Sequence, residues 1–319
     1  MSKIIIGIHG LGNKPPKTLL NDWWKRSILE GLNQFNISLT SFEFELVYWS
    51  DILHPNPLNP DEVNKNSPFF LKNRYFSQKT LNSGESAGLR KKAREYFEKF
   101  YGKIVINEVL SLKYPSLTDL FFHLNMRDLE NYYSPYYVNH DGVEQLAKDA
   151  IIERLTDTLK KHKRKKILLI SHSMGSIIAH DALMDYLSDS EIDTLVSIGS
   201  PLGQKYVLHK ILKGQENNSE NKLKVPANIR RNWFNLSDLD DQVALNHLLA
   251  EIYSPNSKGV KIIDKLVQNN FIENGCRNPH SSYGYLRTPE FAEIVNSFLS
   301  YKKFNLFRWF SFARSNKTL

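Results

Sequence analysis

Short, uninterrupted apolar runs recur along this chain, each separated from the next by a stretch with helical spacing. The first run lies at Lys3 to Ile8 and ends at His9 and Gly10. Such runs are typical of strands buried on both faces, because a half-exposed strand alternates apolar and polar residues. The alternation predicts a three-layer α/β/α sandwich around a mainly parallel sheet. Four later runs have the same character: Phe42 to Trp49, Ile167 to Ser171, Thr194 to Ile198 and Trp233 to Leu236.

Apolar residues at intervals of three and four predict the helices between these strands. The clearest stripe runs from Val143 to Leu159 and leads directly into the strand predicted at Ile167. Further helices are predicted over four segments: Leu19 to Leu32, Ser176 to Tyr186, Val243 to Tyr253 and Pro289 to Leu299.

Residues 51–141 interrupt this rhythm. The stretch is too long for a connecting loop, since structureless loops beyond about 15 residues are uncommon in compact domains. Aromatic-rich helical patterns run from Glu85 to Leu124. We therefore predict a core formed by residues 1–50 and 142–303, with a helical cap inserted at 51–141. Its apolar side chains either enclose an apolar substrate or form the separate core of a small subdomain: Phe97, Phe100, Tyr101, Phe121, Phe122 and Leu124.

Composition narrows the class of protein. No apolar run approaches the roughly 20 residues that a membrane-spanning helix requires, and the N-terminal apolar run is too short for a signal peptide. The single cysteine, Cys276, rules out an internal disulfide. These features predict a cytoplasmic protein whose fold depends on an apolar core. They do not indicate an oligomeric state.

The formal net charge of +8 favours anionic partners. The densest basic run, Lys160 to Lys166, falls where a helical pattern ends, so the helix dipole accounts for much of it. It is accompanied by no zinc-finger spacing, RNA-recognition signature or aromatic-interleaved basic stripe, and we expect no nucleic-acid partner. The tail at residues 304–319 mixes aromatic and basic side chains, as interfacial segments do. We expect it either to contact an anionic membrane peripherally or to dock against the cap.

The pentapeptide Ser171-His172-Ser173-Met174-Gly175 follows a predicted strand and opens a predicted helix. A serine on such a sharp turn has its hydroxyl above the sheet, and the turn accepts only small residues two positions to either side. Ser171 and Gly175 meet this requirement, although Ser171 replaces the usual first glycine. The alternative is a small-residue cluster that only closes a strand–helix junction. We expect the ring of His172 to point away from the serine.

A serine hydroxyl becomes a strong nucleophile when an imidazole removes its proton, and a carboxylate must orient that imidazole. The strand predicted at Trp233 ends in an acidic turn, where we choose Asp241 as the acid, with Asp238 and Asp240 as close rivals. Capping of the next helix is the alternative role for each of these aspartates. His280 lies in a polar loop ahead of the last predicted helix and is the expected base.

The first predicted strand ends in His9-Gly10-Leu11-Gly12, a loop whose backbone N–H groups are expected to face the serine. Acyl transfer forms an oxyanion that needs preorganised donors. We assign these donors to the backbone N–H groups of Leu11 and Met174, and expect His9 to shape the loop. Phosphate binding is a weaker alternative, because no lysine and hydroxyl residue complete a P-loop. The histidines lack metal-ligand spacing, and we expect no metal.

Together these segments resemble the α/β-hydrolase superfamily, particularly its lipase-like and esterase-like members. The resemblance covers most of the chain outside the predicted insertion. It implies a serine hydrolase that cleaves a carboxylic ester, thioester or lipid acyl bond through an acyl-enzyme, with no cofactor. A binding protein without turnover and an acyltransferase are the rival functions. The segments that carry the resemblance are His9-Gly10, Ser171 to Gly175, Val196 to Leu202, the Asp241 turn and Pro279-His280.

Overall fold

The computed structural model of the chain describes residues 1–37, 41–77, 128–134, 146–187, 190–213, 223–273 and 275–300.

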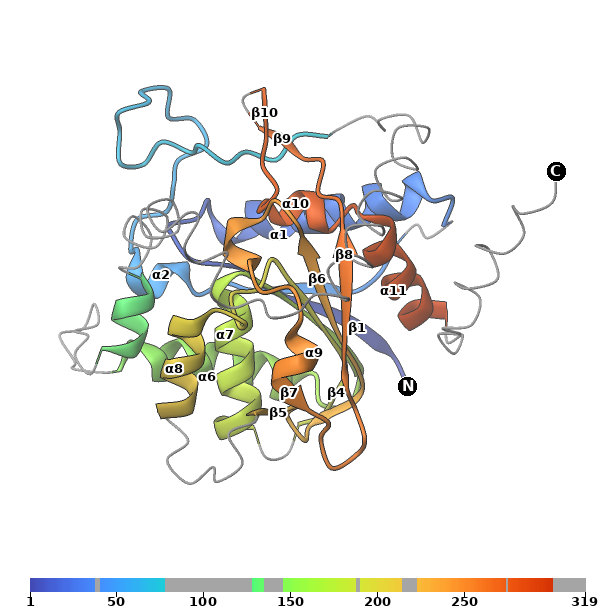
Figure 1. Cartoon of the computed structure of the whole chain (residues 1–319). Coiled ribbons are helices and arrows are strands. Elements are labelled where there is room, and N and C mark those ends of the chain that lie inside the picture. The colour runs from blue at the N-terminus through green and yellow to red at the C-terminus, as the bar shows by residue number, and fades with distance from the viewer. Residues whose placement is uncertain are drawn as a thin grey trace.

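A six-stranded sheet forms the centre of the molecule, and all of its neighbouring strands are parallel (Figure 1). The strand order is β2-β1-β3-β4-β6-β8. Parallel strands end at the same edge of a sheet, so the loops after β1, β3, β4 and β6 meet there. The six strands are β1 (Lys3–Ile8), β2 (Phe44–Val47), β3 (Lys166–His172), β4 (Ile192–Ile198), β6 (Ile229–Asp238) and β8 (Ile262–Val267).

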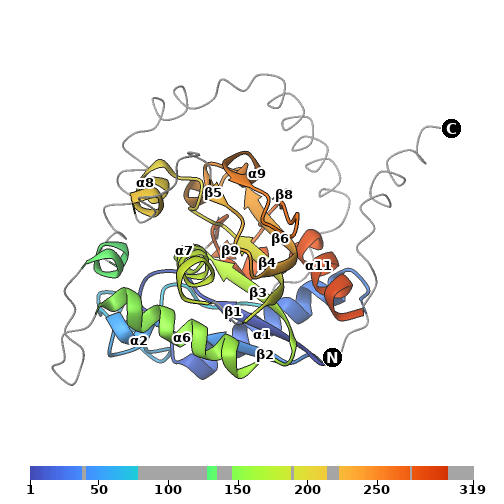
Figure 2. The same ribbon diagram turned by 90° about the horizontal axis from the view of Figure 1, so that it is seen from below.

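Helices cover both faces of the sheet, which confirms the predicted α/β layers (Figure 2). One face is covered by α6 (Ala147–Lys161) and α7 (Met174–Asp181), with α8 (Lys205–Lys213) and α9 (Leu249–Ile252) beside them. The other face is covered by α1 (Lys17–Gln34), α10 (Ser282–Tyr285) and α11 (Pro289–Ser300).

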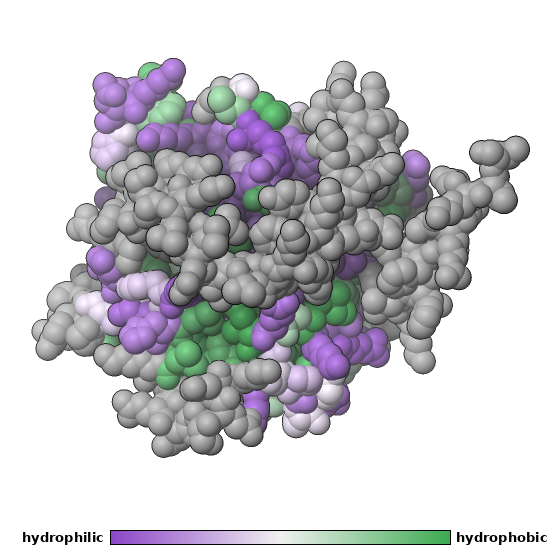
Figure 3. Space-filling model, viewed as in Figure 1, coloured by the Kyte–Doolittle hydropathy of each residue, from purple (hydrophilic) through white to green (hydrophobic). Residues whose placement is uncertain are grey.

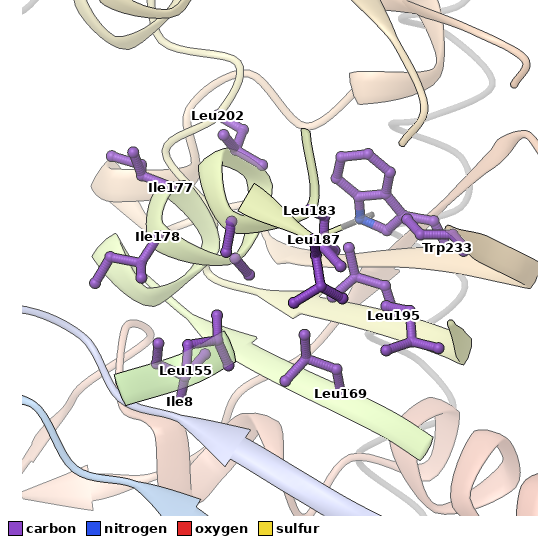
Figure 4. Close-up of a cluster of buried hydrophobic side chains, with 14 of the residues drawn as sticks. Ile8, Leu155, Leu169, Ile177, Ile178, Leu183, Leu187, Leu195, Leu202 and Trp233 are labelled. Carbon is purple, nitrogen blue, oxygen red and sulfur yellow. The ribbon is translucent and has the colours of Figure 1, made fainter. Parts of the chain in front are cut away.

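The side chains of β1 show why its apolar run is uninterrupted. Ile4, Ile6 and Ile8 pack into the cluster under α6 and α7, whereas Ile5 packs into the cluster under α1 and α11. Successive strand residues point to opposite faces, so a strand covered on both sides needs apolar residues throughout. Figure 4 shows the first cluster, in which Ile177 and Ile178 of α7 lie over the strands.

Several short elements connect the layers. Helix α7 continues as a π-helical turn, η1 (Ala182–Tyr186). Among the described residues, two small two-stranded pairs lie outside the main sheet. Other short elements in this part of the chain are α2 (Ser50–Leu53), β5 (Leu223–Lys224), the 3-10 turn η2 (Gln242–Ala244), β7 (Tyr253–Ser254), β9 (Ile272–Glu273) and β10 (Cys276–Arg277).

The helix predicted over Val243 to Tyr253 is wrong as a continuous element. The chain forms η2, leaves the helix, and re-forms one turn at α9 before β7. The Asp264 carboxylate accepts hydrogen bonds from the backbone N–H groups of Leu249 and Ala250, at 3.1 and 2.9 Å, and so starts a new helix there. The Asn246 side chain donates to the Gly203 carbonyl, at 3.2 Å, in the break between them.

The basic run after α6 is partly neutralised by the neighbouring strand. Lys161 and His162 both contact the Glu45 carboxylate, at 2.9 and 2.6 Å, and Lys165 pairs with Glu43. Helix α6 ends at Lys161, where cations also complement the helix dipole. This arrangement supports the structural interpretation of the run.

The predicted insertion is described only at 51–77 and 128–134, where residues 128–133 are helical. Its apolar positions from Phe97 to Leu124 and the tail at 304–319 lie outside the described residues, so the cap and the membrane contact stay predictions. None of the described helices is long and apolar enough to cross a membrane. Apolar surface gathers over α7 and beside α9 on the side seen in Figure 3.

Candidate active site

Ser173 occupies the sharp turn between β3 and α7. Its backbone has φ 53° and ψ −128°, a conformation that costs a non-glycine residue about 1–3 kcal/mol. Close packing fixes the turn, because a Cβ atom on Gly175 would lie 2.7 Å from the carbonyl oxygens of Ile8 and His9. Ser171 fits at the position of the usual glycine, but its buried hydroxyl has no hydrogen-bond partner within the described residues.

Three of the predicted residues meet in series at the carboxyl edge of the sheet. Ser173 Oγ lies 3.0 Å from His280 Nε2. His280 Nδ1 lies 3.0 and 2.9 Å from the two carboxylate oxygens of Asp241. The side chains come from the turn after β3, the loop between β10 and α10, and the turn after β6. The structure therefore brings together the predicted serine, histidine and aspartate from three distant segments.

Asp241 is fully buried, with 0% exposure, and every hydrogen bond to it favours the charged form. Tyr285 Oη donates to Oδ2 at 2.7 Å, and the Val243 backbone N–H donates to Oδ1 at 2.9 Å. Burial alone would raise the pKa of Asp241, but His280, Tyr285 and Val243 together hold this pKa below its ordinary value. The carboxylate is therefore ionised at neutral pH.

Tyr285 is a site residue that the sequence did not reveal. Its hydroxyl donates to Asp241 and accepts a hydrogen bond from the backbone N–H of Asp238, at 2.9 Å. It thus ties the acid to the end of β6. The tyrosine lies 44 residues from Asp241 in no recognisable motif, so only the folded chain shows the contact.

The two rival aspartates have other partners. Asp238 and Asp240 both pair with the Arg277 guanidinium of β10. Asp238 also accepts from the Asn269 backbone N–H, and its pKa is raised because burial outweighs these bonds. Of the three aspartates in the turn, Asp241 is the one that contacts His280.

Gly199 provides the space in which the acid and the base meet. Its φ of 55° lies in the left-handed region. A Cβ atom there would approach Asp241 Oδ2 to 2.9 Å and His280 Nδ1 to 3.1 Å. The position after β4 therefore requires glycine for both conformation and space.

The His172 ring lies beside the proposed base. Its centroid lies 4.8 Å from that of His280, and Nε2 donates to the His280 carbonyl at 2.9 Å. Burial, with the nearby His280, lowers the pKa of His172 to about 3. The ring is therefore neutral at working pH and supports the loop that carries His280.

The His9 ring fixes the start of the loop after β1. His9 Nε2 accepts from the Trp49 backbone N–H at 3.1 Å, so Nδ1 carries the proton and donates to the Gly10 carbonyl at 2.8 Å. The carbonyl and the N–H of one trans peptide group point in opposite directions. The bond to Gly10 O therefore turns the N–H of Leu11 away from His9.

The two predicted donors lie beside the serine. Leu11 follows Gly10, where an added Cβ would lie 2.8 Å from Ser173 Cβ. Met174 is the first residue of α7, where backbone N–H groups lack intrahelical acceptors. Neither N–H has an acceptor among the described residues. Both positions thus suit the reception of a negative charge next to Ser173 Oγ.

In the described part of the chain, no group of three or more His, Cys, Asp or Glu side chains is placed to hold a metal ion. The arrangement of Asp241, His280 and Ser173 instead suits proton transfer to and from a serine oxygen.

Comparison with known proteins agrees with this geometry. A family model described as the PGAP1-like alpha/beta domain matches residues 137–270, a stretch that contains Ser173 and Asp241. A search of curated proteins found no match. The matched family is of the α/β-hydrolase type, which suggests a hydrolase-like function. In the matched stretch, and in its parallel six-stranded sheet flanked by helices, this chain is similar to α/β-hydrolases.

Proposed function

We propose that the protein is a serine hydrolase that cleaves a carboxylic ester, lipid acyl esters included, through an acyl-enzyme. The observation that carries this proposal is the unbroken contact from Asp241 through His280 to Ser173 Oγ. The strained backbone of Ser173 supports it, because such strain is concentrated at functional sites.

In the proposed first half of the reaction, Ser173 Oγ attacks the ester carbonyl carbon. His280 Nε2 accepts the serine proton as the bond forms. The negative charge on the carbonyl oxygen is received by the N–H groups of Leu11 and Met174. The intermediate then collapses, His280 returns the proton to the alcohol oxygen, and the alcohol leaves the acylated Ser173.

In the second half, water attacks the acyl carbon and His280 takes the water proton. The tetrahedral intermediate expels Ser173 Oγ, which recovers its proton from His280, and the acid is released. Asp241 holds the His280 tautomer with the proton on Nδ1 and stabilises the imidazolium formed in both halves. Within the described residues, no lysine or arginine pairs with Asp241, so its charge acts on His280.

A fluorophosphonate probe tests the proposal directly, because it reacts with serines activated in this way. We expect the full-length protein to be labelled and Ser173→Ala to lose labelling. Ser27→Ala is the matched control, since Ser27 is also buried but donates to the Trp23 carbonyl in α1. Folded wild-type protein that is not labelled would contradict the proposal and favour a binding protein that keeps the fold.

Turnover of p-nitrophenyl esters of increasing chain length then defines the acyl group. Each ester is assayed with and without an added alcohol or amine. Free acid as the main product supports hydrolysis. Transfer to the acceptor that exceeds hydrolysis would identify an acyltransferase, because both reactions share the same acyl-enzyme.

A further inference from the structure

Residues 9–14, called here the 9–14 loop, carry a lysine that folds back onto its own backbone. Lys14 Nζ donates to the carbonyl oxygens of Leu11 and Gly12, the latter at 3.0 Å. Lys14 is partly buried, and its own carbonyl accepts from the Leu58 backbone N–H at 2.9 Å. The ammonium group is thus directed at the loop that carries the proposed oxyanion donor.

An aspartate from a distant segment binds the same loop from the other side. Asp128 Oδ2 accepts from the Gly12 backbone N–H at 2.6 Å, across 116 residues of sequence. His54 Nε2 contacts both oxygens of Asp128, at 3.0 and 3.1 Å. Asp128 is 5% exposed. It is the first described residue of the helical stretch 128–133, which belongs to the predicted insertion.

Lys14 and Asp128 hold the two ends of one peptide group. The Leu11 carbonyl and the Gly12 N–H belong to the same peptide plane, and the two charged side chains bind one end each. Gly12 has a φ of 85°, in the region where glycine turns easily. Without these contacts, the peptide plane between Leu11 and Gly12 is free to rotate.

The preceding peptide plane is held by the His9 ring, through Gly10 O. The Leu11 N–H lies in this Gly10–Leu11 plane, and the Leu11–Gly12 plane holds the other side of the Leu11 Cα atom, so contacts on both planes keep the N–H in place. Oxyanion donors act through preorganisation, so a small rotation of this N–H lowers the rate without altering ground-state binding.

We propose that Lys14 and Asp128 are positioning residues that clamp the Leu11–Gly12 peptide, so that the Leu11 N–H faces the oxyanion of the Ser173 reaction. This inference rests on the proposed function. It also makes turnover depend on the segment that delivers Asp128, since removal of that carboxylate releases the Gly12 end of the clamp.

Single and double variants test the clamp. Lys14→Met and Asp128→Asn are each expected to lower kcat on a p-nitrophenyl ester by about tenfold to a hundredfold, below the effect of losing a whole oxyanion donor, with KM nearly unchanged. Lys17→Met and Asp157→Asn are matched controls, because both residues are exposed. Lys14→Arg should restore most of kcat, since guanidinium also donates to carbonyls.

The double variant distinguishes a shared clamp from two separate structural effects. Substitutions of two residues that hold the same group have non-additive effects. The double variant Lys14→Met/Asp128→Asn should therefore lose about as much kcat as the worse single variant. Effects that multiply would overturn the shared clamp. Unchanged kcat in Lys14→Met, beside a wild type with Ser173-dependent turnover, would overturn the role of Lys14 alone. A wild type without such turnover overturns the proposed function and the clamp together.

A pH profile provides a measurement that remains informative if Lys14→Met does not fold. Burial lowers the pKa of Lys14 to about 8, opposed by Asp128. The wild-type kcat should therefore fall as pH rises through about 8, whereas Lys14→Arg keeps its rate. Identical profiles for the two proteins would overturn the proposal. The other titratable groups around Lys14 are Asp128, His9, His54, His172 and Tyr48.

Unfolding at alkaline pH would not explain this fall in kcat. A lysine whose pKa is lowered on folding binds fewer protons in the folded state between pH 8 and 10.5, so its contribution to stability rises with pH there. Thermal unfolding of the wild type, measured across the same range, separates the two effects.

Discussion

Helix α7 has a cluster of histidine, aspartate and tyrosine at each end, and only one cluster includes a serine. The N-terminal cluster is the Asp241 site. In the C-terminal cluster, Asp181 accepts from Tyr132 Oη at 3.0 Å, and His180 Nδ1 lies 3.4 Å from the carboxylate. Lys148 Nζ also contacts Asp181, at 2.6 Å. The two clusters share residue types but differ in what surrounds the carboxylate.

The difference shows what turns such a cluster into a candidate site. Lys148 neutralises Asp181, and His180 Nε2 is buried without a hydrogen-bond partner in the described residues. Asp241 instead contacts His280, and the other nitrogen of that ring meets Ser173. An uncompensated carboxylate and a strained serine, rather than the histidine–aspartate contact itself, distinguish the proposed active site.

Replacement of the two histidines should give the largest contrast. His280→Gln removes the proposed base and is expected to lower kcat/KM by about 10⁴-fold or more. His180→Gln should leave kcat/KM within about twofold, because His180 contacts no proposed site residue. Ester turnover at neutral pH, with circular dichroism to check folding, measures both. An equal loss in the two variants would contradict the assignment of the N-terminal cluster.

Replacement of Asp241 should affect mainly turnover, and replacement of Asp181 should affect mainly stability. Asp241→Asn is expected to lower kcat by about 10³–10⁴-fold, because the amide favours the wrong His280 tautomer. Asp181→Asn should keep kcat but lower the free energy of unfolding by roughly 1–3 kcal/mol, since Lys148 loses its partner. Urea unfolding and ester turnover, measured on both variants, check this. Loss of turnover in folded Asp181→Asn would remove the contrast.

Most of the central sheet was predictable because strands covered on both faces have unbroken apolar runs. Strand β8 was missed, since Asp264 and Lys265 interrupt its run at the edge of the sheet. The boundary of the helix after Asp241 was also unpredictable, because Asp264 creates the second helix start through a tertiary contact. Hydrophobic periodicity in the sequence indicates which residues are buried. It does not show where a contact from a distant side chain begins or ends a helix.

The candidate site was predictable in part for a similar reason. The turn at Ser173 has a local signature of small residues, and chain order placed the acid and the base downstream. The choice of Asp241 over its two neighbours depends on which carboxylate the fold buries beside His280. The contacts of Tyr285 and Asp128 join distant segments, and no local pattern indicates them.

Replacement of Tyr285 and of Tyr132 should give a smaller difference in kcat than replacement of the histidines or aspartates. Tyr285→Phe removes the bond to Asp241 and leaves the Asp238 N–H without an acceptor. We expect kcat to fall by about tenfold and the free energy of unfolding by roughly 1–3 kcal/mol. Tyr132→Phe should change only stability, by roughly 1 kcal/mol. A Tyr285→Phe variant with wild-type kcat would show that the remaining contacts suffice to place Asp241.

The smallest expected effect is the fall in the free energy of unfolding at acidic pH, when Asp181 becomes protonated. Burial would raise its pKa, but His180 and Lys148 hold it below the ordinary value of 3.8. A carboxylate with a lowered pKa contributes stability that is fully present above the unfolded pKa and is lost as pH falls through the folded one. The urea midpoints of the wild type and Asp181→Asn should therefore differ at pH 6 and approach each other only as pH falls below 3.8. A difference that stays constant with pH would mean that the carboxyl stabilises α7 through neutral hydrogen bonds, and that Lys148 is not what separates the two clusters.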